Sequence, residues 1–387
     1  MMRAVTGDHI IFNECIEAFR PEKPSINIEE KQLVGYLLLD FKLNQELDFE
    51  HFTIKPSIEV YHKGAYSSFV AHVVLKSTHE VYSPHLFITA LSAIISFVFQ
   101  RPVKAPRDGY LVGEMELDED LLYEIAIQYP ILTAGPGAHR TRIHKNELSE
   151  LYNELKEVIE FLYDVPLKKY KEFMQSIRLV QLAFLNQRED FALGYYLLVS
   201  AIEPFLQKAI KDKEVISKHP LVEEWKSIAK DNESVDELFN EYKRISSMNK
   251  YIGKRFVEFI MKYCPPSQWD KLKHPHEDIA LESAEVTGKK NDWITKKQWY
   301  EIYPVDLTEE EIRDILLNAY KHRSEFTHQG KNPPHKNPNS FNRFFEQKVI
   351  FKEDIPFDRY ELILPNFRLM GFIAKNSILN YLYKQSN

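Results

Sequence analysis

The sequence TEEEIRDILLNAYKHRSEFTHQG, residues 308 to 330, decides our interpretation of the fold. Thr308 and Glu311 have the spacing of a capping box, and the glutamates of the first turn lie where the helix dipole favours negative charge. Gly330 is a residue type that commonly ends a helix. The stretch therefore predicts one long helix that stops at the glycine.

Arg323 is predicted to face inward on this helix. A single stripe at helical spacing contains Ile312, Leu316, Ala319, Arg323 and Thr327. A charge on an apolar stripe needs a partner or a function. His328 follows five residues later, about 140° further around an ideal helix. The two side chains are expected to meet only if the helix ends or kinks between them, or if they meet across a dimer.

Arginine and histidine together are a minimal set of groups for cleaving a phosphodiester. Arginine keeps its charge, whereas histidine can exchange a proton near neutral pH. Their spacing alone is weak evidence, because with 14 histidines in the chain about one or two such matches arise by chance. Arg3 and His9 also match, at a terminus without helical context. The capped helix and the inward-facing arginine support the match at Arg323 and His328 more strongly than the spacing does.

The amino-acid composition limits the classes of protein to which this chain can belong. The 387 residues suggest two or three domains, and 44% hydrophobic residues are enough for a core. The net charge of -7 gives no global attraction for nucleic acid, so any such site must be a local patch. Cys15 and Cys264 cannot build a disulfide framework and fit a reducing cytoplasm. The longest apolar run, Leu86 to Phe99, is too short for a membrane span and predicts a buried helix. We expect a cytoplasmic protein.

Residues 1 to 145 are predicted to form an α+β domain. Its apolar and β-branched runs predict strands at Gln32–Leu43, Ser57–His62 and Ser68–Lys76, with a turn at Gly64. Ser83 and Pro84 are a good helix start, and this helix should end near Arg101. A further helix is predicted from Asp118 to Tyr129. The role expected for this domain is to sense a trigger, restrain the other domain or bind a regulatory protein.

A loop with a basic cluster follows, from Thr133 to Lys145. Two glycines and a proline mark the loop, and the cluster comprises His139, Arg140, Arg142, His144 and Lys145. The spacing is not that of a P-loop. Two interpretations stay open: a solvated linker, or a patch that contacts phosphate.

Residues 146 to 387 are predicted to form an all-α domain. Apolar residues three and four positions apart predict helices over Asn146–Tyr163, Leu167–Asn186, Glu189–Ile210, Pro220–Lys230, Ser234–Tyr263, His274–Ala284 and Pro365–Lys384. Pro204 implies a kink or a joint within the third of them. The fold class expected is mainly α, with a C-terminal helical bundle preceded by the α+β domain.

Two segments resemble a known family. AYKHRSEFTHQG, residues 319 to 330, resembles the signature of HEPN domains, particularly the ApeA-like branch, and YYLLVSAIEPFL, residues 195 to 206, resembles their earlier core helix. The resemblance covers about residues 146 to 387. It implies a helical bundle that forms a homodimer, with two copies of the motif in one cleft. Active members are endoribonucleases that need no metal or other cofactor, and many act as toxins or in antiviral defence.

By position, the resemblance assigns the catalytic pair to Arg323 and His328. Ser324 replaces a polar residue that is often asparagine, histidine or aspartate. Glu203 is expected to orient Arg323. The branch paired with nucleotidyltransferases has a tyrosine where this chain has Gly330, so regulation by modification of that tyrosine is not supported. RNA-backbone contacts are assigned to Lys321, His322, Lys331, His335 and Lys336, which otherwise form a solvated basic face.

Other interpretations remain. Arg323 could simply pair with Glu203 or another carboxylate of the bundle, and His328 could be a helix C-cap residue. The domain would then be a non-catalytic HEPN module for RNA binding or dimeric assembly. A metal hydrolase is a third possibility, because His274, His276 and Asp278 are close in sequence, as are His322, His328 and His335. Neither group has a recognised ligand spacing, and we expect no metal.

Overall fold

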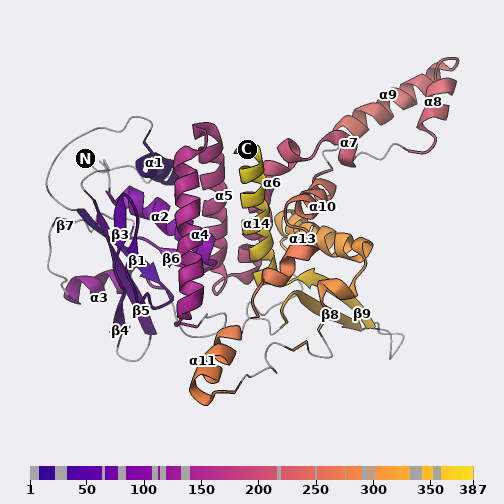
Figure 1. The fold of residues 1–387 in the computed structure, drawn as a ribbon. Helices are drawn as coiled ribbons and strands as arrows, with labels where there is room; N and C mark the ends of the chain where they lie inside the picture. The colour runs from indigo at the N-terminus through magenta and orange to yellow at the C-terminus, as the bar shows by residue number, and fades with distance from the viewer. Residues whose placement is uncertain are drawn as a thin grey trace.

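The structure is a computed structural model, and most of the residues that it describes are helical (Figure 1). It describes residues 8–21, 33–62, 66–76, 84–106, 112–113, 119–131, 140–215, 219–248, 251–274, 276–289, 296–297, 301–331, 342–351 and 359–386. The predicted turn at Gly64 and the candidates His335 and Lys336 lie outside these residues.

A small antiparallel sheet lies near the N-terminus. Its long central pair is β1 (Leu33–Leu39) and β5 (Tyr66–Leu75), and the main strand order is β2-β3-β5-β1-β6. β4 (Ile58–His62) pairs with β5, so the three predicted strands are confirmed. The shorter strands are β2 (Leu47–Asp48), β3 (Phe52–Ile54), β6 (Val103–Lys104) and β7 (Val112–Gly113).

Helices cover both faces of this sheet. Leu37 and Leu39 of β1 pack into the main core with α2 (Pro84–Phe99), whereas Leu38 packs with α3 (Glu119–Gln128) in a separate cluster. Alternate side chains of a strand point to opposite faces, which explains why β1 is apolar throughout. The α2 helix is buried, as predicted. A further helix that the sequence had not revealed, α1 (Asp8–Phe19), packs against α2.

Long helices form the middle of the molecule. These are α4 (Lys145–Asp164), α5 (Leu167–Asn186), α6 (Phe191–Ala209) and α14 (Phe367–Ser386). Figure 1 shows them side by side in the middle of the molecule, with the sheet on one side of them. One hydrophobic core continues from α1 and α2 into α5, α6 and α14. The two segments predicted as domains therefore pack tightly on each other. The α6 helix runs unbroken through Pro204, so the predicted joint is absent.

The α6 helix also packs against α10 (Ile252–Tyr263) and α13 (Glu309–Gln329). A hairpin of β8 (Phe345–Phe351) and β9 (Arg359–Pro365) packs against α13. The prediction that residues 146 to 387 are all helical is therefore wrong. Both strands are short runs of mixed apolar and polar residues, and the segment between them, with Asp354, Pro356 and Asp358, is as typical of a loop as of a hairpin turn. Shorter connecting elements are η1 (Pro266–Lys271), α11 (Glu277–Thr287) and η2 (Pro304–Asp306).

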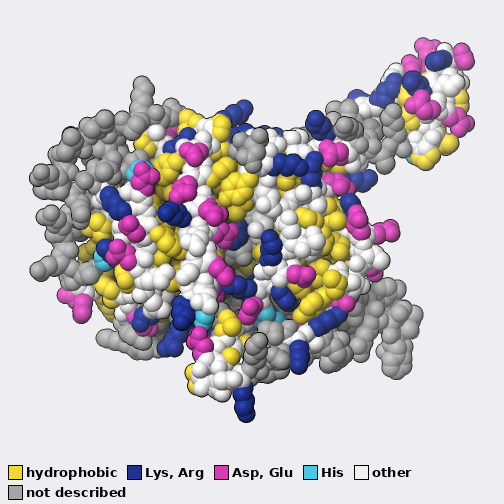
Figure 2. Space-filling model, in the orientation of Figure 1, with side chains coloured by type: hydrophobic (Ala, Val, Ile, Leu, Met, Phe, Trp, Pro, Cys, Tyr) yellow, Lys and Arg dark blue, Asp and Glu magenta, His cyan; other side chains and the backbone are white. Residues whose placement is uncertain are grey.

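A helical arm projects from the body of the molecule (Figure 1). It comprises α7 (Asp212–Val215), α8 (Val222–Ile228) and α9 (Glu233–Met248). The prediction of one helix over Ser234–Tyr263 is wrong, because Tyr251 has a positive φ of 46° and separates α9 from α10. Figure 2 shows hydrophobic side chains exposed on the arm, and Leu238 is 71% exposed.

The helices of the described residues include none with the length and apolarity required to span a membrane. Cys15 and Cys264 are both buried, and no disulfide joins them.

Candidate functional site

The α13 helix has the ends that its sequence predicts. Thr308 Oγ1 accepts a hydrogen bond from the Glu311 N–H at 3.3 Å, and Glu311 Oε2 accepts one from the Thr308 N–H at 2.7 Å. Gly330 caps the other end with a φ of 64°, a conformation that glycine adopts without steric cost. Ile312, Leu316 and Ala319 are buried, and this inner stripe fixes the rotation of the helix.

The inner stripe brings Arg323 to Glu203 on α6. Arg323 Nη2 donates to Glu203 Oε2 at 2.5 Å, and the two side chains are only 17% and 23% exposed. The predicted partnership between these residues is therefore present. Arg323 Nε is buried and has no hydrogen-bond acceptor among the described residues. One carboxylate thus satisfies only part of the guanidinium.

Two tyrosines complete the surroundings of the guanidinium. Its carbon lies 5.2 Å from the ring centre of Tyr196 and 6.0 Å from that of Tyr320. Tyr196 also packs on Phe326, with ring centres 5.2 Å apart. Such cation-π contacts favour a fixed, partly desolvated arginine. Sequence reasoning missed both tyrosines, although Tyr320 lies three residues before Arg323 and therefore on the same helix face.

Burial and hydrogen bonding act against each other on Glu203. Burial raises the pKa of its carboxyl, while the charge of Arg323 and hydrogen bonds from Tyr320 and Arg323 oppose that rise. Burial beside Glu203 raises the pKa of the Tyr320 hydroxyl to about 12. Tyr320 therefore stays protonated at neutral pH and donates to the carboxylate. The three side chains form one network in which Glu203 is the acceptor.

His328 lies elsewhere on α13. Its side chain is exposed in the last turn, and the helix continues without interruption from Glu309 to Gln329. Because no kink separates the two residues, Arg323 and His328 point about 140° apart around the helix axis. A single chain therefore does not bring them together. Of the geometries expected from the sequence, the one that remains is a meeting across two copies of the chain.

The other candidates surround this helix end. Ser324 is half-buried, while Lys321 and Lys331 are exposed. His322 Nδ1 lies 3.9 Å from Glu325 Oε2, and the histidine side chain is 17% exposed. These residues leave exposed positive charge near His328. Their arrangement is compatible with contacts to a nucleic-acid backbone.

The second group of histidines lies between η1 and α11. His274 Nδ1 accepts the backbone N–H of His276 at 3.1 Å, so this nitrogen is occupied when the ring is neutral. Burial, followed by the positive charges of His276, Arg368 and Arg343, lowers the pKa of His274 to about 4. Within the described parts of the chain, no three His, Cys, Asp or Glu side chains gather in a way that could hold a metal.

Comparisons of this chain with protein-family models, with curated proteins and with solved structures found no match.

Proposed function

We propose that this chain is a metal-independent endoribonuclease that works as a homodimer, with Arg323 and His328 as its catalytic residues. The HEPN resemblance suggested the activity. The observation that carries the proposal is that Glu203 holds Arg323 through Nη2 while 17% of the Arg323 side chain stays exposed. A guanidinium fixed in this way is prepared to bind a phosphate oxygen, which arginine commonly binds through two nitrogens.

RNA supplies its own nucleophile in this mechanism. His328 accepts the proton of the 2′-hydroxyl, whose oxygen attacks the adjacent phosphorus, and Arg323 stabilises the charge that develops on the phosphate. A second histidine protonates the departing 5′-oxygen. The products are a 2′,3′-cyclic phosphate and a 5′-hydroxyl. General acid-base catalysis of this kind contributes about 10²–10⁴-fold for each group.

A second copy of the chain supplies the second histidine. Because Arg323 and His328 diverge on one helix, the arginine of one protomer works with the histidine of its partner across the cleft. In a cell, such an enzyme would act as a toxin or an antiviral effector. The N-terminal α+β segment would sense the trigger, restrain the nuclease or bind a regulatory protein.

The first experiment incubates the purified chain with total RNA in EDTA, beside Arg323→Ala and His328→Ala. We expect cleavage by the wild type and none by either variant. The matched controls are Lys168→Ala and His219→Ala, which remove exposed side chains of α5 and of the segment before α8. Loss of wild-type cleavage in EDTA would contradict the proposal and favour a metal hydrolase.

The second experiment mixes the two inactive variants. A mixed dimer contains one intact arginine and one intact histidine on different protomers. We expect partial rather than full recovery of cleavage if the site forms between copies, because the mixed dimer keeps only one of the two histidines that the mechanism uses. A mixture that stays inactive, although both variants still form dimers, would contradict the shared site.

A non-catalytic role is the second candidate, and one observation favours it. Glu203 already neutralises Arg323 within a single chain, which reduces the positive charge available to a substrate. The module would then serve RNA binding or dimeric assembly. Wild-type protein that dimerises or binds RNA, yet releases no cyclic phosphate product, would favour this function.

A further inference from the structure

Tyr196 of α6 and Phe326 of α13 form an aromatic pair next to Arg323. Their ring centres are 5.2 Å apart, and the carbon of the Arg323 guanidinium lies 5.2 Å from the ring centre of Tyr196. Both aromatic side chains are half-buried. Phe326 follows Arg323 by three residues and therefore lies on the same side of α13. The two rings and the guanidinium thus form one continuous surface where α6 meets α13.

This aromatic pair lies outside the hydrophobic core. Leu197 and Tyr320, which neighbour the pair on the same two helices, pack against the main core, whereas neither Tyr196 nor Phe326 belongs to it. An aromatic ring stabilises a protein most when it is fully withdrawn from water. Because folding of the single chain leaves both rings partly exposed, a ligand that covers them gains the free energy of burying them.

Exposed positive charge lies near the same end of α13. Lys321 and Lys331 are exposed, and neither forms an ion pair with a residue that the structure describes. Lys321 precedes His328 by seven residues, so the two side chains lie only about 20° apart around the helix. In the dimer proposed above, the partner's His328 reaches Arg323, and Lys321 enters the same cleft on the same helix face. The cleft therefore attracts a negatively charged ligand.

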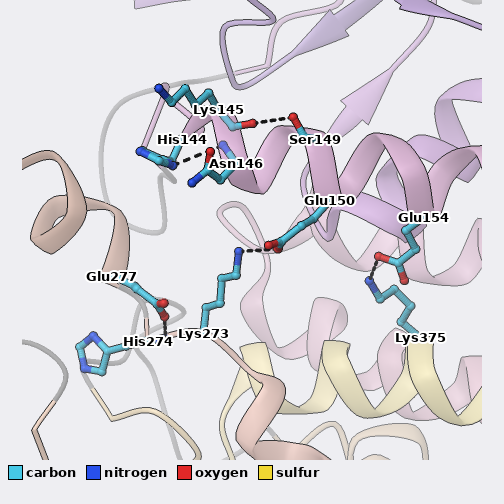
Figure 3. A network of polar contacts seen from close by, with 10 residues as sticks. All are labelled: His144, Lys145, Asn146, Ser149, Glu150, Glu154, Lys273, His274, Glu277 and Lys375. Carbon is cyan, nitrogen blue, oxygen red and sulfur yellow. Dashed lines mark hydrogen bonds and ion pairs between the residues drawn. The ribbon is translucent and has the colours of Figure 1, made fainter. Parts of the chain in front are cut away.

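A second group of basic side chains faces α4, and its charges are already paired. Figure 3 shows Glu150 and Glu154 pointing from α4 toward Lys273 and Lys375. The charged atoms are 3.0 Å apart in the first pair and 2.8 Å apart in the second. Arg140 of the basic loop likewise donates to a carboxylate of α11 at 2.5 Å. These carboxylates reduce the positive charge that a polyanion meets there, whereas the lysines at the end of α13 keep theirs.

Aromatic rings beside exposed cations are the combination with which proteins bind single-stranded nucleic acid. The cations follow the phosphates, and the bases stack on the rings, whatever the sequence, because every base has a flat aromatic face. Unpaired RNA bases are recognised in this way, whereas the bases of a duplex are already paired and stacked on one another. The surface formed by Tyr196, Phe326 and Arg323 therefore fits an unpaired nucleotide.

We propose that the Tyr196–Phe326 pair is a stacking site for an unpaired RNA base, and that the substrate is therefore single-stranded RNA. This inference rests on RNA as the ligand of the α13 site and adds the class of RNA that it accepts. The base lies against Phe326, and the adjacent phosphate meets the guanidinium of Arg323. Tyr196 contacts both side chains and fixes the distance between base and phosphate. A duplex is excluded, because its bases are not free to stack on a protein ring.

The test measures RNA binding without cleavage, in the His328→Ala variant of the full chain. Fluorescence anisotropy compares three ligands of equal length: a single strand of mixed sequence, its duplex, and an abasic strand that has the same phosphates but no bases. We expect the single strand to bind at least about tenfold more tightly than the abasic strand and more tightly than the duplex. If the abasic strand or the duplex binds as tightly as the single strand, the proposal is wrong.

Phe326→Leu locates the stacking site, because leucine keeps an apolar side chain but has no ring. In the same background it should weaken binding of the single strand by about tenfold and leave binding of the abasic strand unchanged. Tyr123→Leu on α3 is the matched control, since Tyr123 is also half-buried and belongs to neither hydrophobic cluster. Phe326→Leu that binds the single strand like this control, or that loses affinity for both strands equally, would overturn the assignment.

Two substitutions of Tyr196 separate stacking from folding. Phenylalanine keeps the ring, whereas leucine removes it, so Tyr196→Phe should bind the single strand more tightly than Tyr196→Leu. Thermal unfolding of both variants shows whether the chain stays folded, and the abasic strand reports any change in phosphate binding through Arg323. If the two folded variants bind the single strand equally well, the ring of Tyr196 is not part of a stacking site.

Dimer formation and cleavage are measured beside binding. If Phe326→Leu prevents dimer formation in analytical ultracentrifugation and causes no base-dependent loss of affinity, the pair is a contact between copies and the stacking proposal is wrong. Cleavage in EDTA tests the nuclease separately. A chain that binds single strands through their bases but does not cleave them supports the stacking site and contradicts the nuclease. A chain that cleaves RNA equally well with Phe326→Leu contradicts the stacking site alone.

Discussion

Arg323 of α13 donates a 2.5 Å hydrogen bond to Glu203 of α6, across 120 residues of sequence. The pair joins residues 195 to 206 to residues 319 to 330. Their helices also contact each other along the apolar stripe that ends at Arg323. The charge pair is therefore fixed by packing that does not itself involve charge.

A double-mutant cycle measures the strength of this pair. We expect Arg323→Met and Glu203→Gln each to destabilise the chain, and the double variant to lose less than the sum. The coupling free energy should be about 1–2 kcal/mol, since both side chains are mostly but not completely withdrawn from water. Urea unfolding of the four proteins gives this value. Strict additivity would show that the contact adds no stability.

The basic residues at the end of α13 can be tested through salt dependence. We expect Lys321→Ala and Lys331→Ala each to weaken binding of single-stranded RNA and to reduce the slope of log K against log salt by about 0.7, the value for one phosphate contact. Fluorescence anisotropy in the His328→Ala background avoids cleavage during the measurement. Lys168→Ala is the control, and slopes identical to the control would exclude both lysines from the interface.

Gly194 fixes the approach of α5 and α6. A Cβ at this position would lie 2.9 Å from the Ala183 carbonyl oxygen and 3.2 Å from Phe367 Cε2. We expect Gly194→Ala to destabilise the chain by about 1–3 kcal/mol, because the clash outweighs a gain in helix propensity of about 1 kcal/mol. Thermal unfolding checks this. A higher Tm would show that the helices can separate without cost.

His274 makes stability depend on pH in a defined window. Its pKa is about 4 in the folded chain and 6.5 in the unfolded chain, so between these values the unfolded state binds more protons. Stability due to this group is complete above pH 6.5 and is lost as the pH falls toward 4. We expect a loss of about 1–2 kcal/mol, after allowing for the partial exposure of the ring.

Unfolding of the wild type and of His274→Asn, measured from pH 7 to pH 4, tests this dependence. Asparagine keeps an acceptor near the position of Nδ1 but does not titrate. The variant should show a shallower loss of stability. Identical profiles would assign the pH dependence to other groups.

Local sequence signals predicted the elements that have strong periodicity or clear caps. Thr308, Glu311 and Gly330 bound α13 as expected, and the apolar run before Phe99 is the buried α2. The β8–β9 hairpin and the break at Tyr251 were missed. The hairpin is stabilised by packing on α13, and the residue with the positive φ at the break is a tyrosine, a residue type that rarely adopts this conformation.

The sequence by itself determined that Arg323 faces inward, because helical periodicity fixes which residues share a face. Only the tertiary structure decided that Glu203, 120 residues away, is the carboxylate that meets it. Only the tertiary structure decided that α13 continues past His328, so that the two candidate catalytic side chains diverge within one chain. The tertiary structure also brought Tyr196 of α6 to Phe326 and Arg323 of α13. Contacts between residues far apart in sequence depend on how the helices pack, and no local pattern encodes that arrangement.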